Sequence, residues 1–272
     1  MSASATKLVL TAALAAGSVL AAQAPDVDTI ISRSVQANQA DFSAAPEFNN
    51  KETDKTPKGS KTYQVTMIEG TPYQRLIAVN GKPLPPDQQQ REFQKQQQVI
   101  SQRKAESPEQ RRQRIAKWER DRTRDNTMMQ QLTKAFTFKI IGEGELRGFK
   151  VWRLRATPRP GYQPPNMDSQ VLPGMAGQLW IDQKTYQWVK VTAEVIHPVS
   201  IEGFLAQVEP GTRFELEKSP VEGGSWQVTH FSVNSRAKVL FLISKSSNQN
   251  DTYFDFQPAG MPGQNATASS AR

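Results

Sequence analysis

The sequence contains no cysteine, and only two of its 272 residues are histidines. The absence of cysteine excludes disulfide bonds, thiolate metal sites and a lipid-modified N-terminal cysteine. The two histidines, His197 and His230, lie on different expected strands and in no metal-binding motif, so we expect structural roles for both. Without these stabilising devices the chain depends on its hydrophobic core, and it is long enough to form one within a single domain.

Sequence signatures of catalysis are also missing. The chain has no nucleophile elbow, no phosphate-binding loop and no dinucleotide fingerprint. Acidic residues two positions apart occur at Glu143 and Glu145 and at Glu215 and Glu217. Such pairs are common on solvated hairpins, and they differ from the paired carboxylates that flank a glycosidic bond. We therefore predict a protein without enzymatic activity, cofactor or metal.

A long apolar run occurs once, near the start of the chain. It extends from Leu8 to Ala22 behind a single cation, Lys7. This pattern is typical of a secretory signal peptide, with cleavage expected after Ala21. The alternative, a transmembrane anchor, requires about 20 apolar residues, which is longer than this run. We expect residues 1–21 to be removed and the rest to be exported to the periplasm, soluble or peripheral to a membrane.

The remaining chain is expected to form one domain at 22–257, followed by a disordered tail at 258–272. Apolar residues at helical spacing between Val27 and Val35 predict a short amphipathic helix. Two strands are expected next, at 63–67 and 73–79.

The composition changes sharply at 85–135, where glutamine and arginine dominate and helix is predicted. We expect a break near Ser107, because Ser-Pro-Glu-Gln supplies an N-cap, a proline at the first helical position and an early acid. The glutamine-rich first half is a candidate for partial disorder. In the second half, an apolar stripe is expected to dock on the body at its two ends; it comprises Ile115, Trp118, Met129, Leu132 and Phe136.

Charge is concentrated in the same insertion. The formal net charge is +8, or +7 without Lys7, and the stretch from Arg103 to Arg124 contains nine cations and four anions. An excess of cations favours anionic partners, and phospholipid is more available than nucleic acid to an exported protein. The alternative is an ordinary solvated helix face. The candidates for an anionic-surface site are Arg111, Arg112, Arg114, Lys117, Arg120 and Arg124.

From Phe136 onward the pattern predicts a long antiparallel meander, so the fold class is α+β and mainly antiparallel β. The last predicted strands are "SWQVTHFSV" and "AKVLFLIS". An outer-membrane barrel also has alternating strands after a signal peptide. The helical insertion and the polar tail, which lacks a terminal aromatic strand, rank this alternative below a soluble protein.

The hairpin "GQLWIDQKTYQWVKV", at 177–191, is apolar on both faces. If Asp182 pairs with Tyr186, Trp180 faces Trp188 on one side, while the other side is aliphatic. A tryptophan pair opposite the core suits the wall of a cavity, although two packed protein layers are an equally valid interpretation. The candidates for a ligand cavity are Trp152, Leu154, Trp180, Trp188 and Phe204.

The signal peptide, the N-terminal helix, the meander and this hairpin resemble the LolA/LolB-like group of bacterial envelope proteins. The stretches "PYQRLIAVNGKPL", "ATPRPGYQPP" and "LWIDQKTYQWVKVTAEVI" are similar to exported proteins of that general kind. The resemblance implies an incomplete antiparallel β-barrel, closed by helices on its concave side, that holds acyl chains or a lipidated protein. It implies transport, sorting or sensing without catalysis.

The basic insertion at 85–135 is not a feature of the best-known carriers in that group. The alternative function is therefore an envelope structural or adaptor protein, whose insertion binds an anionic membrane or a protein partner. In both cases we expect a monomer that does not bind nucleic acid.

Overall fold

The computed structural model describes residues 25–44, 48–201, 206–239 and 243–259. The predicted signal peptide and most of the predicted tail lie outside these residues. Four helical segments are described: α1 (Val27–Ala44), α2 (Pro86–Lys104), α3 (Pro108–Ala135) and the 3-10 helix η1 (Asp168–Gly174).

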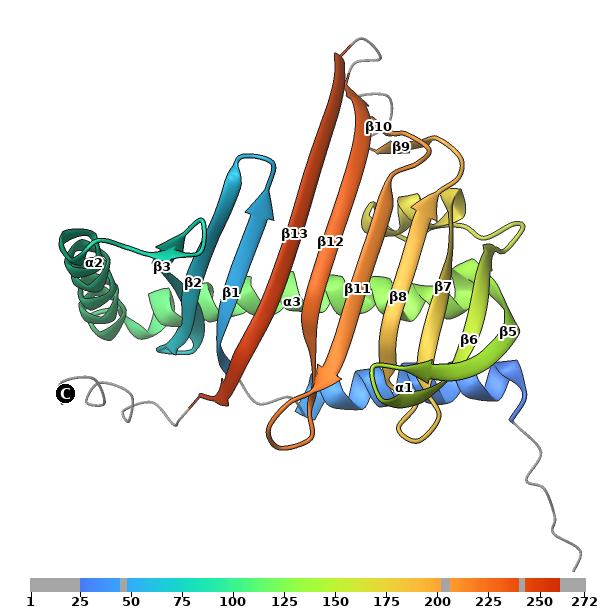
Figure 1. Cartoon of the computed structure of the whole chain (residues 1–272), viewed down its shortest axis with the longest axis horizontal. Coiled ribbons are helices and arrows are strands. Elements are labelled where there is room, and N and C mark those ends of the chain that lie inside the picture. Colours follow the sequence, from blue (N-terminus) through green and yellow to red (C-terminus); the bar gives the residue numbers. More distant parts are fainter. Residues whose placement is uncertain (1–24, 45–47, 202–205, 240–242, 260–272) are drawn as a thin grey trace, which may run out of the picture.

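The described strands form one antiparallel sheet with the order β4-β3-β2-β1-β13-β12-β11-β8-β7-β6-β5, and β9 and β10 are added beside β12 (Figure 1). The sheet is open, with β4 and β5 at its edges, so the predicted fold class, an α+β half-barrel, is confirmed. The strands are β1 (Phe48–Thr56), β2 (Gly59–Ile68), β3 (Thr71–Val79), β4 (Lys82–Pro83), β5 (Phe136–Leu146), β6 (Phe149–Pro158), β7 (Met175–Asp182), β8 (Trp188–Val195), β9 (Val199–Ile201), β10 (Ala206–Val208), β11 (Arg213–Pro220), β12 (Trp226–Val239) and β13 (Ile243–Pro258).

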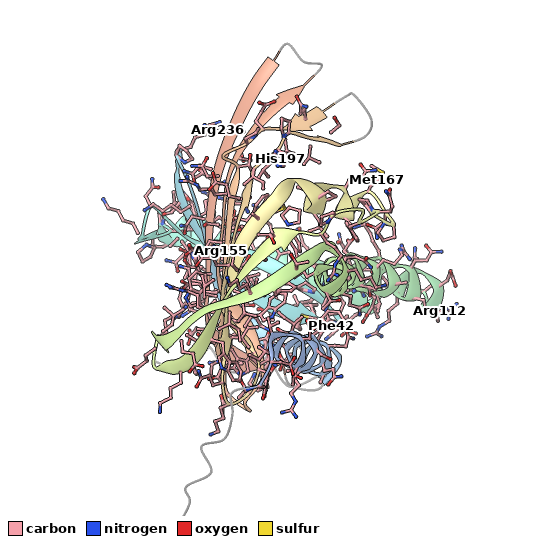
Figure 2. All side chains as sticks on the ribbon, turned by 90° about the vertical axis from the view of Figure 1, so that its right-hand side faces the viewer. Phe42, Arg112, Arg155, Met167, His197 and Arg236 are labelled. Atoms are coloured by element: carbon pink, nitrogen blue, oxygen red, sulfur yellow. The ribbon has the colours of Figure 1, made fainter. Side chains whose placement is uncertain are left out.

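The helices α1 and α3 lie on the same side of the sheet, which we call the helix face; the opposite side is the outer face (Figure 2). In Figure 1, α3 runs across the sheet from the side of β3 to the side of β5, and α1 lies near the ends of the strands β5 to β8. The predicted N-terminal helix is α1, and the predicted helical insertion consists of α2 and α3.

The break between α2 and α3 occurs where it was predicted. Ser107 and Gln110 form a capping box: the Gln110 amide donates to Ser107 Oγ at 3.2 Å, and the Ser107 amide donates to Gln110 Oε1 at 2.9 Å. The expectation of partial disorder in the glutamine-rich half was wrong, because α2 is helical throughout. Its Gln, Arg, Lys and Glu residues are good helix formers, and no proline or glycine interrupts them.

The helix α3 docks at its two ends, as the apolar stripe predicted. Near its start, Ile115 lies so close to Gly70 that a Cβ at Gly70 would be 3.0 Å from Ile115 Cδ1. Gly70 also has φ +88°, a conformation that favours glycine at this turn. Near the end of α3, Leu132 packs against the core and Ala135 is fully buried.

The polar end of α1 is anchored to the sheet by a buried lysine. Lys218 Nζ donates to Asn38 Oδ1 at 2.8 Å and lies 3.7 Å from Asp41 Oδ2. Asp41 also accepts a hydrogen bond from the Trp226 amide at 3.1 Å. Burial lowers the pKa of Lys218, and the nearby Asp41 carboxylate opposes this effect.

Two strand predictions were wrong. The polar strand β1 was not predicted, because "FNNKETDKT" has no apolar alternation; pairing with β2 and β13 on both sides places it in the sheet. The stretch "AKVLFLIS" is not a separate strand. Instead β12 continues to Val239 and β13 begins at Ile243, so the chain reverses within it.

The predicted register of the hairpin was also wrong. Asp182 faces Gln187 rather than Tyr186: its amide donates to the Gln187 carbonyl at 2.9 Å. The Asp182 carboxylate closes the turn by accepting from the amide and hydroxyl of Thr185 at 2.8 and 2.7 Å. Tyr186 adopts a positive φ of 60°, which allows the longer loop.

A β-bulge then separates the two tryptophans. Ile181 pairs with Trp188, whereas Trp180 pairs with Lys190, so Val189 is the extra residue on β8. Because a bulge reverses the alternation of faces, Trp188 lies on the helix face and Trp180 on the outer face. The predicted cross-strand tryptophan pair does not form.

Candidate ligand-binding site

The helix face of β5 to β8 is a packed hydrophobic core. Trp152, Leu154 and Trp188 are at most 5% exposed there, and the core extends to Ile30 of α1. These three candidates for the ligand cavity thus lie together. They contact protein rather than open space.

The other two cavity candidates lie elsewhere. Trp180 is on the outer face and packs against a small cluster formed by Val151, Val189 and Trp226. Phe204 lies outside the described residues. The structure therefore does not bring the five candidates to one wall.

The centre of the helix face is different, because its apolar side chains are only half-buried. The register aligns Phe214 with Val233 and Leu216 with Phe231, and Phe214 packs against the core. The main contacts of α3 are with β3 at one end and with α1, η1 and β5 at the other. We call this surface the central floor; it comprises Tyr63, Leu76, Phe214, Leu216, Phe231 and Val233.

The central floor was not among the sites predicted from the sequence. Each of its strands alternates in the ordinary way, so nothing local shows which face the helices cover. Only the pairing from Val191 through Leu216 to Phe231 places these residues on the helix face.

Above the central floor, two rings and a guanidinium connect α1 to α3. The Arg122 guanidinium carbon lies 4.9 Å from the Phe42 ring centroid and 4.8 Å from that of Trp118. This cation–π contact fixes α3 against α1.

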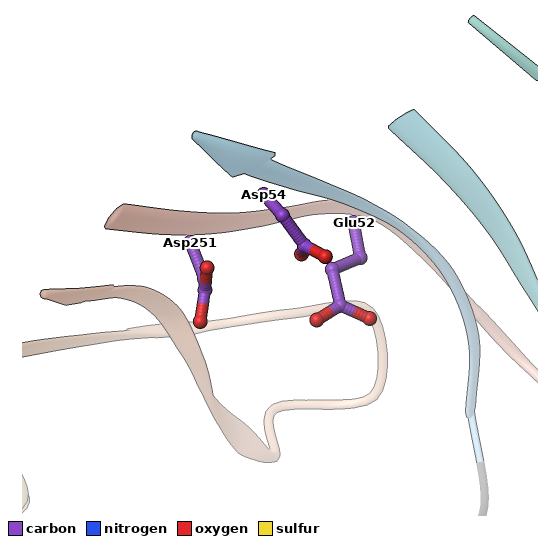
Figure 3. Close-up of side chains that lie close together, drawn as sticks. All are labelled: Glu52, Asp54 and Asp251. Atoms are coloured by element: carbon purple, nitrogen blue, oxygen red, sulfur yellow. The ribbon is translucent and has the colours of Figure 1, made fainter. Parts of the chain in front are cut away.

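Three carboxylates lie together on β1 and β13 (Figure 3). Glu52 faces Tyr63 and Asp251 faces Phe231, so these carboxylates interrupt the central floor between β2 and β12. The oxygens of Glu52, Asp54 and Asp251 are within 4.8 Å of one another. Gln74 donates to Glu52 Oε2 at 2.7 Å, and Gln249 donates to Asp251 Oδ2 at 2.6 Å. Asp251 is 3% exposed, and its Oδ1 is buried without a hydrogen-bond donor.

The acidic trio is electrostatically perturbed. Burial, followed by the charge of Asp54, raises the pKa of Glu52 to about 7. Burial also raises the pKa of Asp251 and that of the neighbouring Tyr253 phenol. Three carboxylates this close together can share protons or hold a cation. In the described part of the chain, these three residues are the group of acidic side chains that could hold a metal ion.

Two of the six predicted anionic-surface cations bind groups outside α3. Arg114 forms an ion pair with Glu106 at 2.6 Å and donates to Thr71 Oγ1 at 2.6 Å. Arg111 forms an ion pair with Glu69. Both fasten α3 to the turn between β2 and β3, where Arg103 also binds the carbonyls of Ile68, Thr71 and Pro72.

The other four cations lie along α3. Arg112 pairs with Glu109 at 2.5 Å and Lys117 with Asp121 at 3.1 Å, and both cations are exposed. Arg120 is exposed as well. Arg124 is part of α3, and its side chain lies outside the described residues.

Among the described residues, no helix is both long and apolar enough to cross a membrane. The class of protein that the fold defines is an open antiparallel half-barrel with helices over one face.

Solved structures similar to this chain include a LolA superfamily protein of Nitrosomonas europaea, with 10% identity, a TM-score of 0.31 and coverage of 88% of this chain and 96% of that one. A putative outer membrane lipoprotein-sorting protein domain of Vibrio parahaemolyticus has 10% identity, a TM-score of 0.30 and coverages of 86% and 95%. The MucA/MucB complex of Pseudomonas aeruginosa includes a chain with 12% identity, a TM-score of 0.25 and coverages of 87% and 100%. No family model and no curated protein matches the sequence.

Proposed function

We propose that this protein is a noncatalytic envelope protein that holds acyl chains, free or attached to a protein, on the central floor of its helix face. The observation that carries the proposal is the central floor itself: six apolar or aromatic side chains remain half-buried on the face that α3 crosses. An incompletely covered apolar surface of this kind is typical of a ligand or partner site.

The physical driving force would be burial of the chain between α3 and the sheet. Each buried methylene contributes about 0.8 kcal/mol, so about ten of them would supply about 8 kcal/mol before the entropic cost of binding. The Arg122 contact and the Arg114 ion pair would hold α3 in place over the ligand. Export to the periplasm, one domain at 22–257 and a monomeric state belong to the same proposal.

The test combines a search for bound lipid with a substitution on the central floor. Native mass spectrometry of the purified protein should detect copurifying lipid, and a fluorescent fatty acid should bind and be displaced by palmitate. Phe231→Ser on the floor should weaken binding of the probe about tenfold or more, because a large apolar contact is lost. Phe254→Ser, on the outer face and 41% exposed, is the matched control and should bind as the wild type does. Equal binding by both variants would refute the proposal.

A second candidate function is an adaptor that uses the helical insertion. The observation in its favour is α2, which has no buried residue and carries Phe93 with 47% exposure. Among the candidates whose side chains the structure describes, the exposed cations Arg112, Lys117 and Arg120 are available to a membrane. Sedimentation with phosphatidylglycerol vesicles, compared between the wild type and a triple glutamine variant at these positions, tests this role.

A further inference from the structure

The outer face has a hollow of about 560 Å³ that spans β6, β7, β8, β11 and β12. The register places its main residues in one row: Arg155 faces Gln178, Gln178 faces Thr192, Thr192 faces Glu215, and Glu215 faces Ser232. The hollow therefore extends from β12, at the centre of the sheet, to β6, which is next to the edge strand β5. It is on the face opposite to the central floor.

The hollow exists because short side chains lie between long ones. Ala176, Thr192 and Ser232 are short, and the neighbouring Arg155 and Gln178 are long. A second row, in which Ala176 faces Glu194 and Glu194 faces Arg213, closes one end.

Among the described residues, some polar and charged side chains around the hollow have hydrogen-bond or ion-pair partners and others do not. Glu215 forms an ion pair with Lys190 at 2.7 Å, and Arg213 with Glu194 at 3.2 Å. In contrast, the side chains of four of the residues that line the hollow make no hydrogen bond or ion pair with other described residues: Arg155, Gln178, Thr192 and Ser232. One unpaired cation and three neutral hydrogen-bonding groups therefore face a common space.

We propose that this hollow binds an acidic oligosaccharide. A sugar carboxylate would accept hydrogen bonds from the Arg155 guanidinium, and hydroxyl groups would bind Gln178, Thr192 and Ser232. The volume is within the range of small-molecule sites, about 300–1,000 Å³.

Other ligands fit these groups less well. A peptide strand needs a free sheet edge, but the backbone groups of these five strands are paired within the sheet. An anionic phospholipid needs an apolar groove for its chains, whereas the row across this hollow is polar.

The experiment compares two sugars and two variants by isothermal titration calorimetry at low salt. The purified protein should bind hyaluronan tetrasaccharide about tenfold more tightly than neutral cellotetraose, because only the former has carboxylates. Arg155→Gln should abolish that preference and leave binding of the fluorescent fatty acid unchanged. Arg153→Gln is the matched control: it removes an exposed arginine from the same face of the same strand, outside the lining of the hollow.

Three results would overturn the proposal. The first is the absence of measurable binding of either sugar at millimolar concentration. The second is an equal effect of Arg153→Gln and Arg155→Gln. The third is Arg155-dependent binding of phosphatidylglycerol vesicles without binding of the tetrasaccharide, which would indicate a lipid-headgroup site.

Discussion

At the scale of single residues, the acidic trio depends on a meeting of distant strands that the local sequence does not show. The trio comprises Glu52, Asp54 and Asp251. Two come from β1 and one from β13, and direct pairing of Asp54 with Asp251 brings them together. Burial, and then the charge of Asp54, raises the pKa of both Glu52 and Asp251. Near neutral pH the negative charge of the trio therefore lowers the stability of the folded protein, unless bound protons or a cation neutralise it.

We predict that the free energy of unfolding decreases between pH 4.5 and about 7 through Glu52. Because its folded pKa is raised, the unfolded chain releases this proton near pH 4.5, while the folded protein keeps it until about pH 7. The contribution is therefore fully present below pH 4.5 and is lost as the pH rises. Urea unfolding at a series of pH values should show this trend, and Glu52→Gln should flatten it.

The exposed Glu109 provides the control for this measurement. Its pKa is lowered by the hydrogen bond from Arg112, so Glu109→Gln should not flatten the trend. An unchanged pH profile in Glu52→Gln would contradict the prediction.

At the scale of elements, arginines of the helical insertion bind the turn between β2 and β3, which precedes them in the chain. Arg103, Arg111 and Arg114 all bind groups between Ile68 and Pro72. The cations that suggested an anionic partner from the sequence thus include residues that stabilise the fold.

We predict that Arg114→Met loosens the α2–α3 junction and lowers the free energy of unfolding by about 1–3 kcal/mol. The reason is that Glu106 and Thr71 lose a part-buried charged donor. Hydrogen exchange should increase in α2 and in the first turns of α3, and the end of α3 near Leu132 should be unaffected. Arg112→Met, which removes an exposed pair, should change neither quantity appreciably; a similar effect of both variants would argue against the anchoring role.

At the scale of the whole molecule, the first and last described strands, β1 and β13, pair in the middle of the sheet. The strand β13 pairs with β1 on one side and with β12 on the other, so it joins the polar half of the sheet to the apolar half. The helix α3 connects the same two halves across the helix face.

We therefore predict that the protein unfolds in one cooperative transition. Tryptophan fluorescence, which reports mainly on β6, β7, β8 and β12, and far-ultraviolet circular dichroism should give coincident melting curves. A separate early transition seen only by circular dichroism would indicate that α2 and the strands β1 to β3 unfold independently, and would contradict the single-domain expectation for 22–257.

Several features followed from local sequence alone. The helix α1, the break at Ser107, the docking ends of α3 and the antiparallel order of most strands were predicted, because apolar spacing, capping groups and turn residues act over a few positions. The half-barrel was implied by the resemblance to the LolA/LolB-like group, and the packing of Trp152 beside Leu154 follows from simple alternation.

Tertiary structure alone decided which residues share a face across strands. The bulge at Val189 separates Trp180 from Trp188, pairing on both sides makes a strand of the polar β1, and the register places both the central floor and the acidic trio on the helix face. Strand register depends on contacts between distant parts of the chain, and a shift of one residue exchanges the two faces. The sequence by itself therefore determined the elements and their order, whereas the position of each candidate site depended on long-range pairing.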